Sequence, residues 1–165
     1  MKELNVPYYK QAKPYTCGPT TLQMVLAYYG AYYPEKLLVE KLKTNEDVGT
    51  WRSRMYEIAV RLGLYCYENE GSEISDIRHL LSLRIPPIVR FLEVGENEDH
   101  YGVVVGANDF VLKIHDPWSG PSQEYQIDDF LSRWTFDKYE DCKQWLMAIS
   151  PAPIPVIKET VIPYE

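Results

Sequence analysis

The sequence predicts a single α+β domain in which helices come first and an antiparallel sheet follows. Between residues 17 and 83 the apolar residues recur mostly at helical spacing. Between residues 87 and 116 they form short runs separated by turn residues, which is typical of strands. The length of 165 residues suits one domain, and the 45% hydrophobic and 25% charged residues are those of an ordinary globular protein rather than a disordered chain or a coiled coil.

The first half is expected to contain four helices and one short strand. Leu22 and Val25 lie on one face of the first helix, which Gly30 ends. Pro34 suits the first turn of the second helix, and Gly63 stops the third. The expected helices are 17–29, 34–42, 50–62 and 72–83, with a strand at 64–67.

The second half is expected to supply most of the sheet, followed by a tail. Prolines crowd the segment from residue 151 onward, and proline has no N–H to donate to a sheet. We therefore expect a domain over residues 1–150 and an extended or disordered tail over 151–165. The expected elements before the tail are strands at 87–92, 100–106, 110–116 and 145–149 and a helix at 128–134.

Composition excludes several function classes. The net charge of −7 gives no positive field for nucleic acid. No apolar run approaches the roughly 18–20 residues that span a bilayer, and the N-terminus lacks a signal-peptide core, so we expect a cytoplasmic protein without a membrane span. The three cysteines, Cys17, Cys66 and Cys142, form no CxxC pattern, which predicts no metal and no cofactor and suits a reducing compartment.

Cys17 is the candidate nucleophile because it stands where the first helix begins. Thr16 is a plausible N-cap and Pro19 fits the first turn. The free N–H groups and the positive dipole end of a helix stabilise a thiolate at that place. Gly18 would let another backbone approach closely. The alternative is that Cys17 is a small buried hydrophobic residue.

Gln11 stands six residues before Cys17 and is the candidate oxyanion donor. A glutamine amide can donate a hydrogen bond to a developing oxyanion together with the backbone N–H of the cysteine. Taken alone, Gln11 could equally be a solvated loop residue. The combination of glutamine, cysteine and helix is similar to the beginning of papain-like cysteine peptidases.

Three histidines could supply the base. His79 lies on the polar side of a predicted helix and is expected at the surface. His100 opens one predicted strand and His115 lies near the end of the next. The choice between the last two depends on which face of the sheet each occupies.

The alternation along the strands favours His100 with Asp116 as its partner. Asp116 shares a face with the apolar Ile114, whereas His115 lies on the other face. If residues 107–109 form the hairpin loop, His100 falls directly opposite Asp116, close enough for a carboxylate to orient an imidazole. A two-residue loop would put the two side chains on opposite faces. The alternative is a strand-edge histidine and an aspartate that only forms a turn.

Several motifs of the chain, in order and over about residues 5–122, resemble those of the double-glycine leader peptidases, family thirty-nine of the cysteine peptidases. This family is best known as the cytosolic N-terminal peptidase domains of bacteriocin-exporting ABC transporters. The motifs are Gln11-x5-Cys17-Gly18-Pro19-Thr20, Tyr28-Tyr29-Gly30, Gly49-Thr50, Leu62-Gly63-Leu64, Pro86-Pro87-Ile88-Val89, His100-Tyr101-Gly102-Val103-Val104 and Asp116-Pro117-x-x-Gly120.

The resemblance implies a papain-like fold and a role for each of four residues. Cys17 would be the nucleophile, His100 the base, Asp116 the residue that orients it and Gln11 the oxyanion donor. No transporter segment follows, so we expect a free-standing relative with a peptide or protein substrate and a separate transporter as a candidate partner. Gly102 stands where a bulkier apolar residue is expected, and the tail matches no part of the family.

The sequence thus favours a cysteine peptidase that hydrolyses peptide bonds, with leader-peptide processing as a candidate role. Two alternatives use the same fold. One is a papain-like acyltransferase that passes the acyl group to an amine, and the other is a peptide-binding module without turnover. All four site positions are filled, which argues against the binding module.

Overall fold

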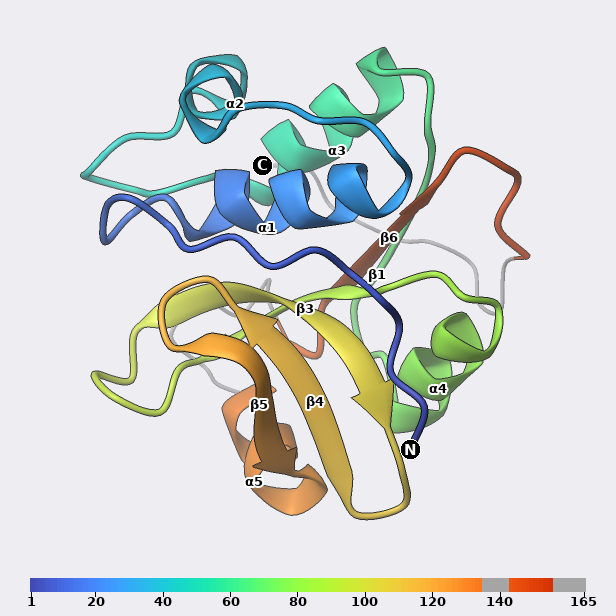
Figure 1. Cartoon of the computed structure of the whole chain (residues 1–165). Helices are drawn as coiled ribbons and strands as arrows, with labels where there is room; N and C mark the ends of the chain where they lie inside the picture. Colours follow the sequence, from blue (N-terminus) through green and yellow to red (C-terminus); the bar gives the residue numbers. More distant parts are fainter. Residues whose placement is uncertain (135–142, 156–165) are drawn as a thin grey trace.

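The computed structural model describes residues 1–134 and 143–155 (Figure 1). Five helices and six strands lie in this part of the chain. The helices are α1 (Cys17–Tyr28), α2 (Glu35–Leu42), α3 (Arg52–Arg61), α4 (Ile74–Ser82) and α5 (Ile127–Trp134). The strands are β1 (Tyr65–Asn69), β2 (Ile88–Leu92), β3 (Asp99–Ala107), β4 (Val111–Asp116), β5 (Gly120–Gln126) and β6 (Leu146–Ser150).

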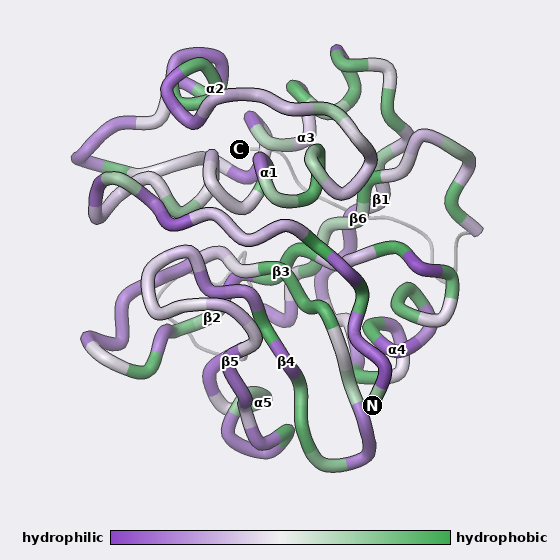
Figure 2. The backbone as a smooth tube through the Cα atoms, viewed as in Figure 1, coloured by the Kyte–Doolittle hydropathy of each residue, from purple (hydrophilic) through white to green (hydrophobic). Residues whose placement is uncertain are grey.

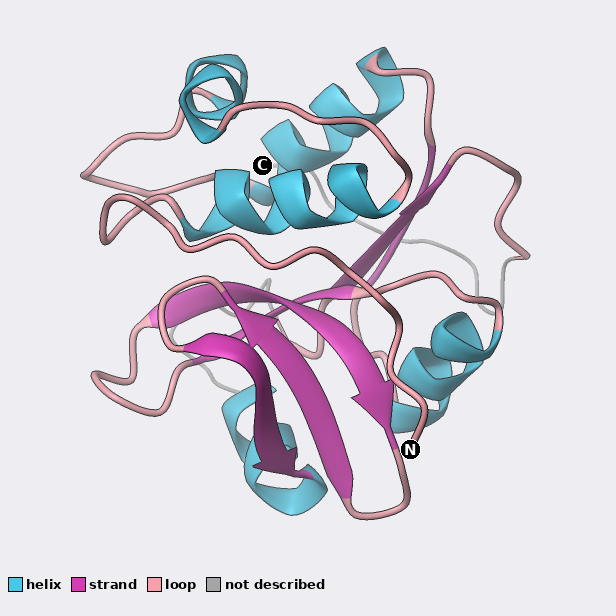
Figure 3. Ribbon diagram, viewed as in Figure 1, coloured by secondary structure: helices cyan, strands magenta, loops and turns pink. Residues whose placement is uncertain are grey.

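The strands form one antiparallel sheet with helices on both faces. Its order is β1-β6-β2-β3-β4-β5, so the last described strand, β6, inserts between β1 and β2. Helices α1, α2 and α3 lie on one side, while α4 and α5 cover the other (Figure 3). The predicted α+β class is therefore confirmed.

Two apolar cores result from this arrangement. In β3, which is hydrophobic along much of its length (Figure 2), Val103 packs toward α1 whereas Val104 packs toward α4 and α5. A strand buried on both faces needs apolar residues at successive positions rather than at alternate ones, and the run Val103–Val105 supplies them. The two-sided burial holds the ends of β3 and β4 in place, where the candidate site lies.

Most predicted elements are present within about two residues of their expected bounds, but one strand was not predicted. β5 carries Gly120 and Pro121, and Tyr125 is its one buried side chain. An edge strand of this composition lacks the apolar alternation that identifies strands, and proline is tolerated there because the edge needs no donor.

The predicted tail lies mostly beyond the described part of the chain. Residues 151–155 follow β6, and Ile154 packs against the core next to α4 and α5. Residues 156–165 and Cys142 lie outside the described residues, so the domain boundary at residue 150 stays a prediction. Within the described ranges, no helix is long and apolar enough to cross a membrane.

Candidate active site

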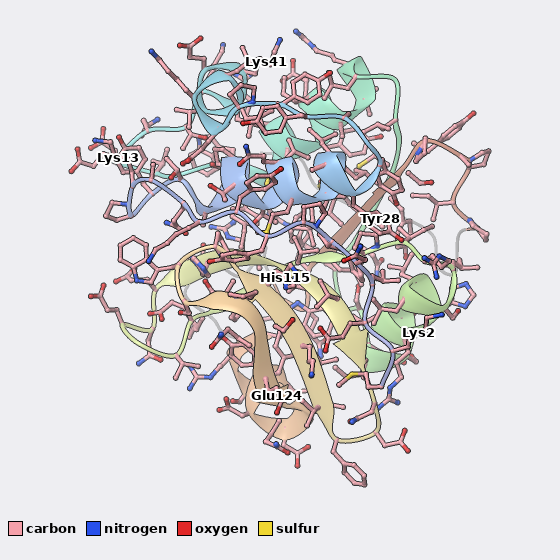
Figure 4. The ribbon with its side chains drawn as sticks, viewed as in Figure 1. Lys2, Lys13, Tyr28, Lys41, His115 and Glu124 are labelled. Atoms are coloured by element: carbon pink, nitrogen blue, oxygen red, sulfur yellow. The ribbon has the colours of Figure 1, made fainter. Side chains whose placement is uncertain are left out.

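A cleft of about 1690 Å³ opens at the end of the molecule where α1 begins. One wall comes from the segment before α1 and from residues 46–54, and the other comes from residues 93–101 together with Trp118 and Ser119. Lys13, labelled in Figure 4, marks this end of the molecule. Three of the predicted site residues, Gln11, Cys17 and His100, line the cleft.

Cys17 is the first residue of α1 and is buried, with 8% of its surface exposed. Thr16 occupies the N-cap position, but its hydroxyl does not cap the helix as predicted. The hydroxyl donates to Lys13 O (3.1 Å) and accepts from Lys13 N (3.2 Å), so it ties α1 to the preceding loop. Because no side chain caps them, the N-terminal N–H groups of α1 can interact with the Cys17 thiol or with a ligand in the cleft.

Gly18 is required by a close neighbour, although this neighbour is a side chain rather than the predicted backbone. A Cβ at Gly18 would lie 2.6 Å from Thr50 Oγ1. Thr50 in turn accepts a hydrogen bond from Tyr101 Oη on its carbonyl oxygen (2.9 Å). This contact fixes the segment before α3 against both α1 and β3, and so fixes the width of the cleft beside Cys17.

His100 and Asp116 meet as predicted. His100 Nε2 donates to Asp116 Oδ1 at 2.7 Å, and both side chains are buried. Because Nε2 is occupied by the carboxylate, the remaining ring nitrogen, Nδ1, is the one available to the Cys17 thiol. The Cys17 thiol is one of the groups that raise the pKa of the imidazole.

The hairpin that brings them together differs from the predicted one. Ala107 pairs with Leu112, and Asn108 N donates to Val111 O at 3.0 Å. The loop is therefore the two-residue turn 109–110 rather than residues 107–109. By itself, such a turn would place the histidine and the aspartate on opposite faces of the sheet.

A β-bulge in β3 restores the shared face. The register shifts between Val104 and Gly106, so β3 has one extra residue there. Beyond the bulge the register sets Gly102 opposite Asp116, and His100 lies two residues further along on the same face. His100 and Asp116 are thus diagonal neighbours across the two strands. The longer loop had predicted that they lie directly opposite each other.

Gly102 makes this diagonal contact possible. A Cβ there would lie 2.7 Å from Ile114 Cγ2 and 3.3 Å from His115 O. The bulkier residue expected from the family resemblance would therefore collide with β4. Glycine at this position lets β3 and β4 approach closely just beside the His100–Asp116 pair.

The electrostatics of the pair favour the charged forms. Burial alone would lower the pKa of His100, but its hydrogen bonds to Asp116 and to Cys17 outweigh burial and raise the pKa to about 10. Burial alone would raise the pKa of Asp116, yet the hydrogen bond from His100 lowers it, helped by the N–H groups of Ser119 and Trp118. These two N–H groups donate to Oδ1 at 3.0 and 2.8 Å. At neutral pH the site therefore holds an imidazolium beside a carboxylate.

Gln11 is held next to this group. Its backbone N donates to Pro117 O (2.9 Å), which anchors the N-terminal segment to the end of β4. The side chain is 4% exposed, and Nε2 donates to Lys13 O at 2.7 Å. An amide nitrogen carries two hydrogens, so one N–H remains for a ligand in the cleft.

The other histidines lie elsewhere. His79 is exposed on α4, as predicted. His115, labelled in Figure 4, is buried under the N-terminal segment: Nε2 donates to Val6 O (3.0 Å) and Nδ1 accepts from Ser122 N (3.0 Å). Both ring nitrogens are occupied by backbone groups, and burial lowers the pKa of His115, so this histidine is a neutral structural residue.

Sequence reasoning missed parts of the site. The backbone donors of Trp118 and Ser119 that hold Asp116 could have been expected, because an aspartate before a turn commonly accepts from the residues that follow it. Glu68, which also lines the cleft, could not, because β1 had no predicted neighbours in the sheet. Among the described residues, no cluster of histidine, cysteine and acidic side chains suits a metal ion.

The helices and the antiparallel sheet form a papain-like fold, which is the fold of C39 peptidase domains. The chain belongs to the Peptidase_C39 like family, whose sequence pattern matches residues 3–142. It is similar in structure to the peptidase domain of Streptococcus ComA, a bi-functional ABC transporter involved in a quorum-sensing pathway (28% identity over 87% of this chain and 97% of that domain, TM-score 0.72). No curated protein sequence matches the chain.

Two further solved structures share the fold. A double glycine motif protease from an AMS/PCAT transporter, in complex with its leader peptide, is 20% identical over 91% of this chain and 94% of that one, with a TM-score of 0.72. A C39-like peptidase candidate from Bacillus anthracis is 15% identical over 91% of this chain and 98% of that one, also with a TM-score of 0.72. These likenesses extend over most of the chain and support one fold for the described residues.

Proposed function

We propose that this protein is a cysteine peptidase that hydrolyses peptide bonds with Cys17 as nucleophile, His100 as base and acid, Asp116 as the orienting residue and Gln11 as an oxyanion donor. The observation that carries the proposal is the buried hydrogen bond from His100 Nε2 to Asp116 Oδ1, in the cleft that Cys17, the first residue of α1, also lines. It orients the imidazole and leaves Nδ1 to the thiol. Membership of a peptidase family supports the same chemistry.

The chemistry follows from the roles of these groups. In the resting site His100 already holds the proton of the Cys17 thiol as an imidazolium, and the Cys17 thiolate attacks the peptide carbonyl to form a tetrahedral oxyanion. The backbone N–H of Cys17 and the free N–H of Gln11 Nε2 stabilise this oxyanion. His100 then protonates the leaving amine, and water hydrolyses the thioester with His100 acting as base.

The substrate is proposed to be a peptide or a protein segment that lies extended in the cleft. A relative of the same fold has been solved with a leader peptide, which supports leader-peptide processing as the physiological class of reaction. We also propose a cytoplasmic location and a separate transporter as partner, since two of the three relatives named above come from transporters.

The test is mass spectrometry of a peptide library incubated with the purified chain, with and without an added amine. We expect hydrolysis products from the wild type and none from Cys17→Ala or His100→Ala. Products coupled to the amine would identify an acyltransferase instead. Cleavage at the wild-type rate in Cys17→Ala would contradict the assigned site.

Two milder variants rank the supporting residues. Gln11→Ala removes one of two oxyanion donors, an effect of roughly 10²–10³ in kcat in other enzymes. Asp116→Asn should reduce the rate less than His100→Ala does, because an amide can still hold the ring. Thermal melting of each variant separates a loss of activity from a loss of fold.

A further inference from the structure

The cleft beside Cys17 is acidic. Eight carboxylates and four Lys or Arg side chains line it in the described part of the chain. Arg90 is ion-paired with Asp99, and Arg54 with Glu57, so half of the cations are neutralised by neighbours within the cleft wall. A surface of this charge favours positively charged ligands. A general field does not by itself make a binding site, however.

Glu68 adds a specific and buried group to this field. Its side chain is fully buried, and neither carboxylate oxygen has a hydrogen-bond partner among the described residues. In β1 it pairs with Met147, which belongs to the core under α1, so its side chain points to the side on which the cleft opens. Glu68 also lines the cleft, so its unpartnered carboxylate lies against the cleft wall.

Among the described residues, no side chain forms a hydrogen bond with the carboxylate of Glu68. Arg52 faces it from α3, but Arg52 Nη1 is ion-paired with Glu70 Oε1 at 2.8 Å, and its guanidinium lies over the Trp145 ring at 5.8 Å. Burial raises the pKa of Glu68 to about 7, Arg52 lowers it, and the charge of Glu70 raises it. The charge of Glu68 also raises the pKa of Cys66, which lies on the same strand. A carboxylate in this position destabilises the fold unless a cation reaches it.

The cleft connects Glu68 to the nucleophile through Tyr101. Tyr101 follows His100 in β3, and its ring lies 5.5 Å from the guanidinium of Arg90. Burial raises the pKa of Tyr101, and the charges of Arg90, Asp99, Cys17 and Arg52 act on it as well. Tyr101 belongs to the same apolar cluster as Cys17, and its ring lies 5.9 Å from that of Trp145, over which the Arg52 guanidinium lies. A side chain of a peptide held at Cys17 can therefore extend past Tyr101 toward Glu68.

We propose that the cleft selects a peptide with a Lys or Arg side chain and that Glu68 is the residue that binds its cationic group. Lys and Arg side chains both combine a long apolar stem, which suits the part of the cleft beside Tyr101, with several N–H donors at the tip. The indole Nε1 of Trp145 is also buried without a partner among the described residues, so the alternative occupant is a water molecule between Trp145 and Glu68. The role of this selection in catalysis rests on the proposed peptidase function, whereas the binding does not.

The test measures binding in the Cys17→Ala protein, which cannot turn the peptide over. The probes are fluorescein-labelled octapeptides of Gly, Ala and Leu with a single Arg at each position in turn, and each has a counterpart with the neutral isostere citrulline. At about pH 8 we expect the best Arg peptide to bind at least about tenfold more tightly than its citrulline counterpart. Adding Glu68→Gln should reduce this ratio to within about twofold, whereas Glu96→Gln, an exposed carboxylate of the same cleft, should leave it above about fivefold.

Three results would overturn the inference: no binding of any Arg peptide, equal binding of Arg and citrulline peptides, or a preference that survives Glu68→Gln. The last is expected if water fills the site. The wild type is assayed for hydrolysis of the same peptides. Binding selectivity without hydrolysis would contradict the peptidase proposal alone, and hydrolysis without selectivity would contradict only the inference about Glu68.

Discussion

Cys17 and Cys66 differ in their surroundings at the scale of single residues. Cys17 begins α1 beside a charged imidazole, whereas burial raises the pKa of the Cys66 thiol and the charge of Glu68 raises it further. Only a thiolate reacts with iodoacetamide. At about pH 6.5 we therefore expect Cys17 to be alkylated at least about tenfold faster than Cys66, measured by peptide mapping of the folded protein.

The His100→Ala variant is the control for this labelling. Without the imidazolium, Cys17 should lose its advantage while Cys66 keeps its slow rate. Equal rates for the two thiols in the folded wild type would argue against an activated nucleophile at Cys17.

His100 also predicts how activity depends on pH. Its pKa is raised from 6.5 to about 10 by Asp116 and Cys17 against the opposing effect of burial, so the imidazolium that protonates the leaving amine is retained well above neutrality. We expect kcat/KM to stay level from about pH 7 to 9 and to fall as the pH approaches about 10, with the apparent value belonging to the Cys17–His100 pair. Circular dichroism at each pH controls for unfolding. An alkaline decline centred near pH 7 would show that the imidazole is not held in its charged form.

At the scale of elements, the β3–β4 hairpin shows what could be predicted from the sequence. Alternation along β4 correctly separated Asp116 from His115, because side chains in a strand alternate between the faces. The loop length was wrong, and the bulge was not predicted. The shorter loop by itself would move His100 to the face opposite Asp116, and the bulge moves it back to the same face. A bulge depends on how β3 bends over the two cores, which no local residue pattern encodes.

Gly102 gives this hairpin a testable constraint. Gly102→Ala places a Cβ 2.7 Å from Ile114 Cγ2, and overpacking of this kind typically costs about 1–3 kcal/mol of unfolding free energy. Ile114→Ala removes Cγ2, so the double variant should be more stable than the sum of the two single losses predicts. Urea unfolding of the four proteins measures this coupling. Strict additivity would mean that the close approach of β3 and β4 does not depend on glycine.

At the scale of the whole molecule, the ordered motifs predicted four site residues but not the cleft around them. Cys17, His100 and Asp116 come from three elements that the sequence identified. The fold of the family that the motifs resemble is sufficient to bring these three residues together. Glu68 is different, because it reaches the cleft through the pairing of β1 with β6, the last strand of the described residues. Pairing between strands so far apart in sequence leaves no local signal, and the charge of the cleft depends on it.

Glu68 also makes the stability of the whole chain depend on pH in an unusual direction. Burial raises its pKa in the folded protein from 4.5 to about 7, so between these values the folded state holds a proton that the unfolded state has lost. Stability therefore decreases as the pH rises through this range, by about 3 kcal/mol for a shift of this size. Glu68→Gln removes the titrating group while keeping its shape.

The difference in unfolding free energy between wild type and Glu68→Gln should thus shift by about 3 kcal/mol in favour of the variant between about pH 4.5 and 8. Urea unfolding across this range measures it, and Glu96→Gln controls for the loss of one negative charge at the surface. A saturating cationic peptide should restore part of the wild-type stability at high pH, because a ligand that binds only the folded state stabilises it. A difference that does not change with pH would show that Glu68 is already compensated within the fold and has no need of a cationic ligand.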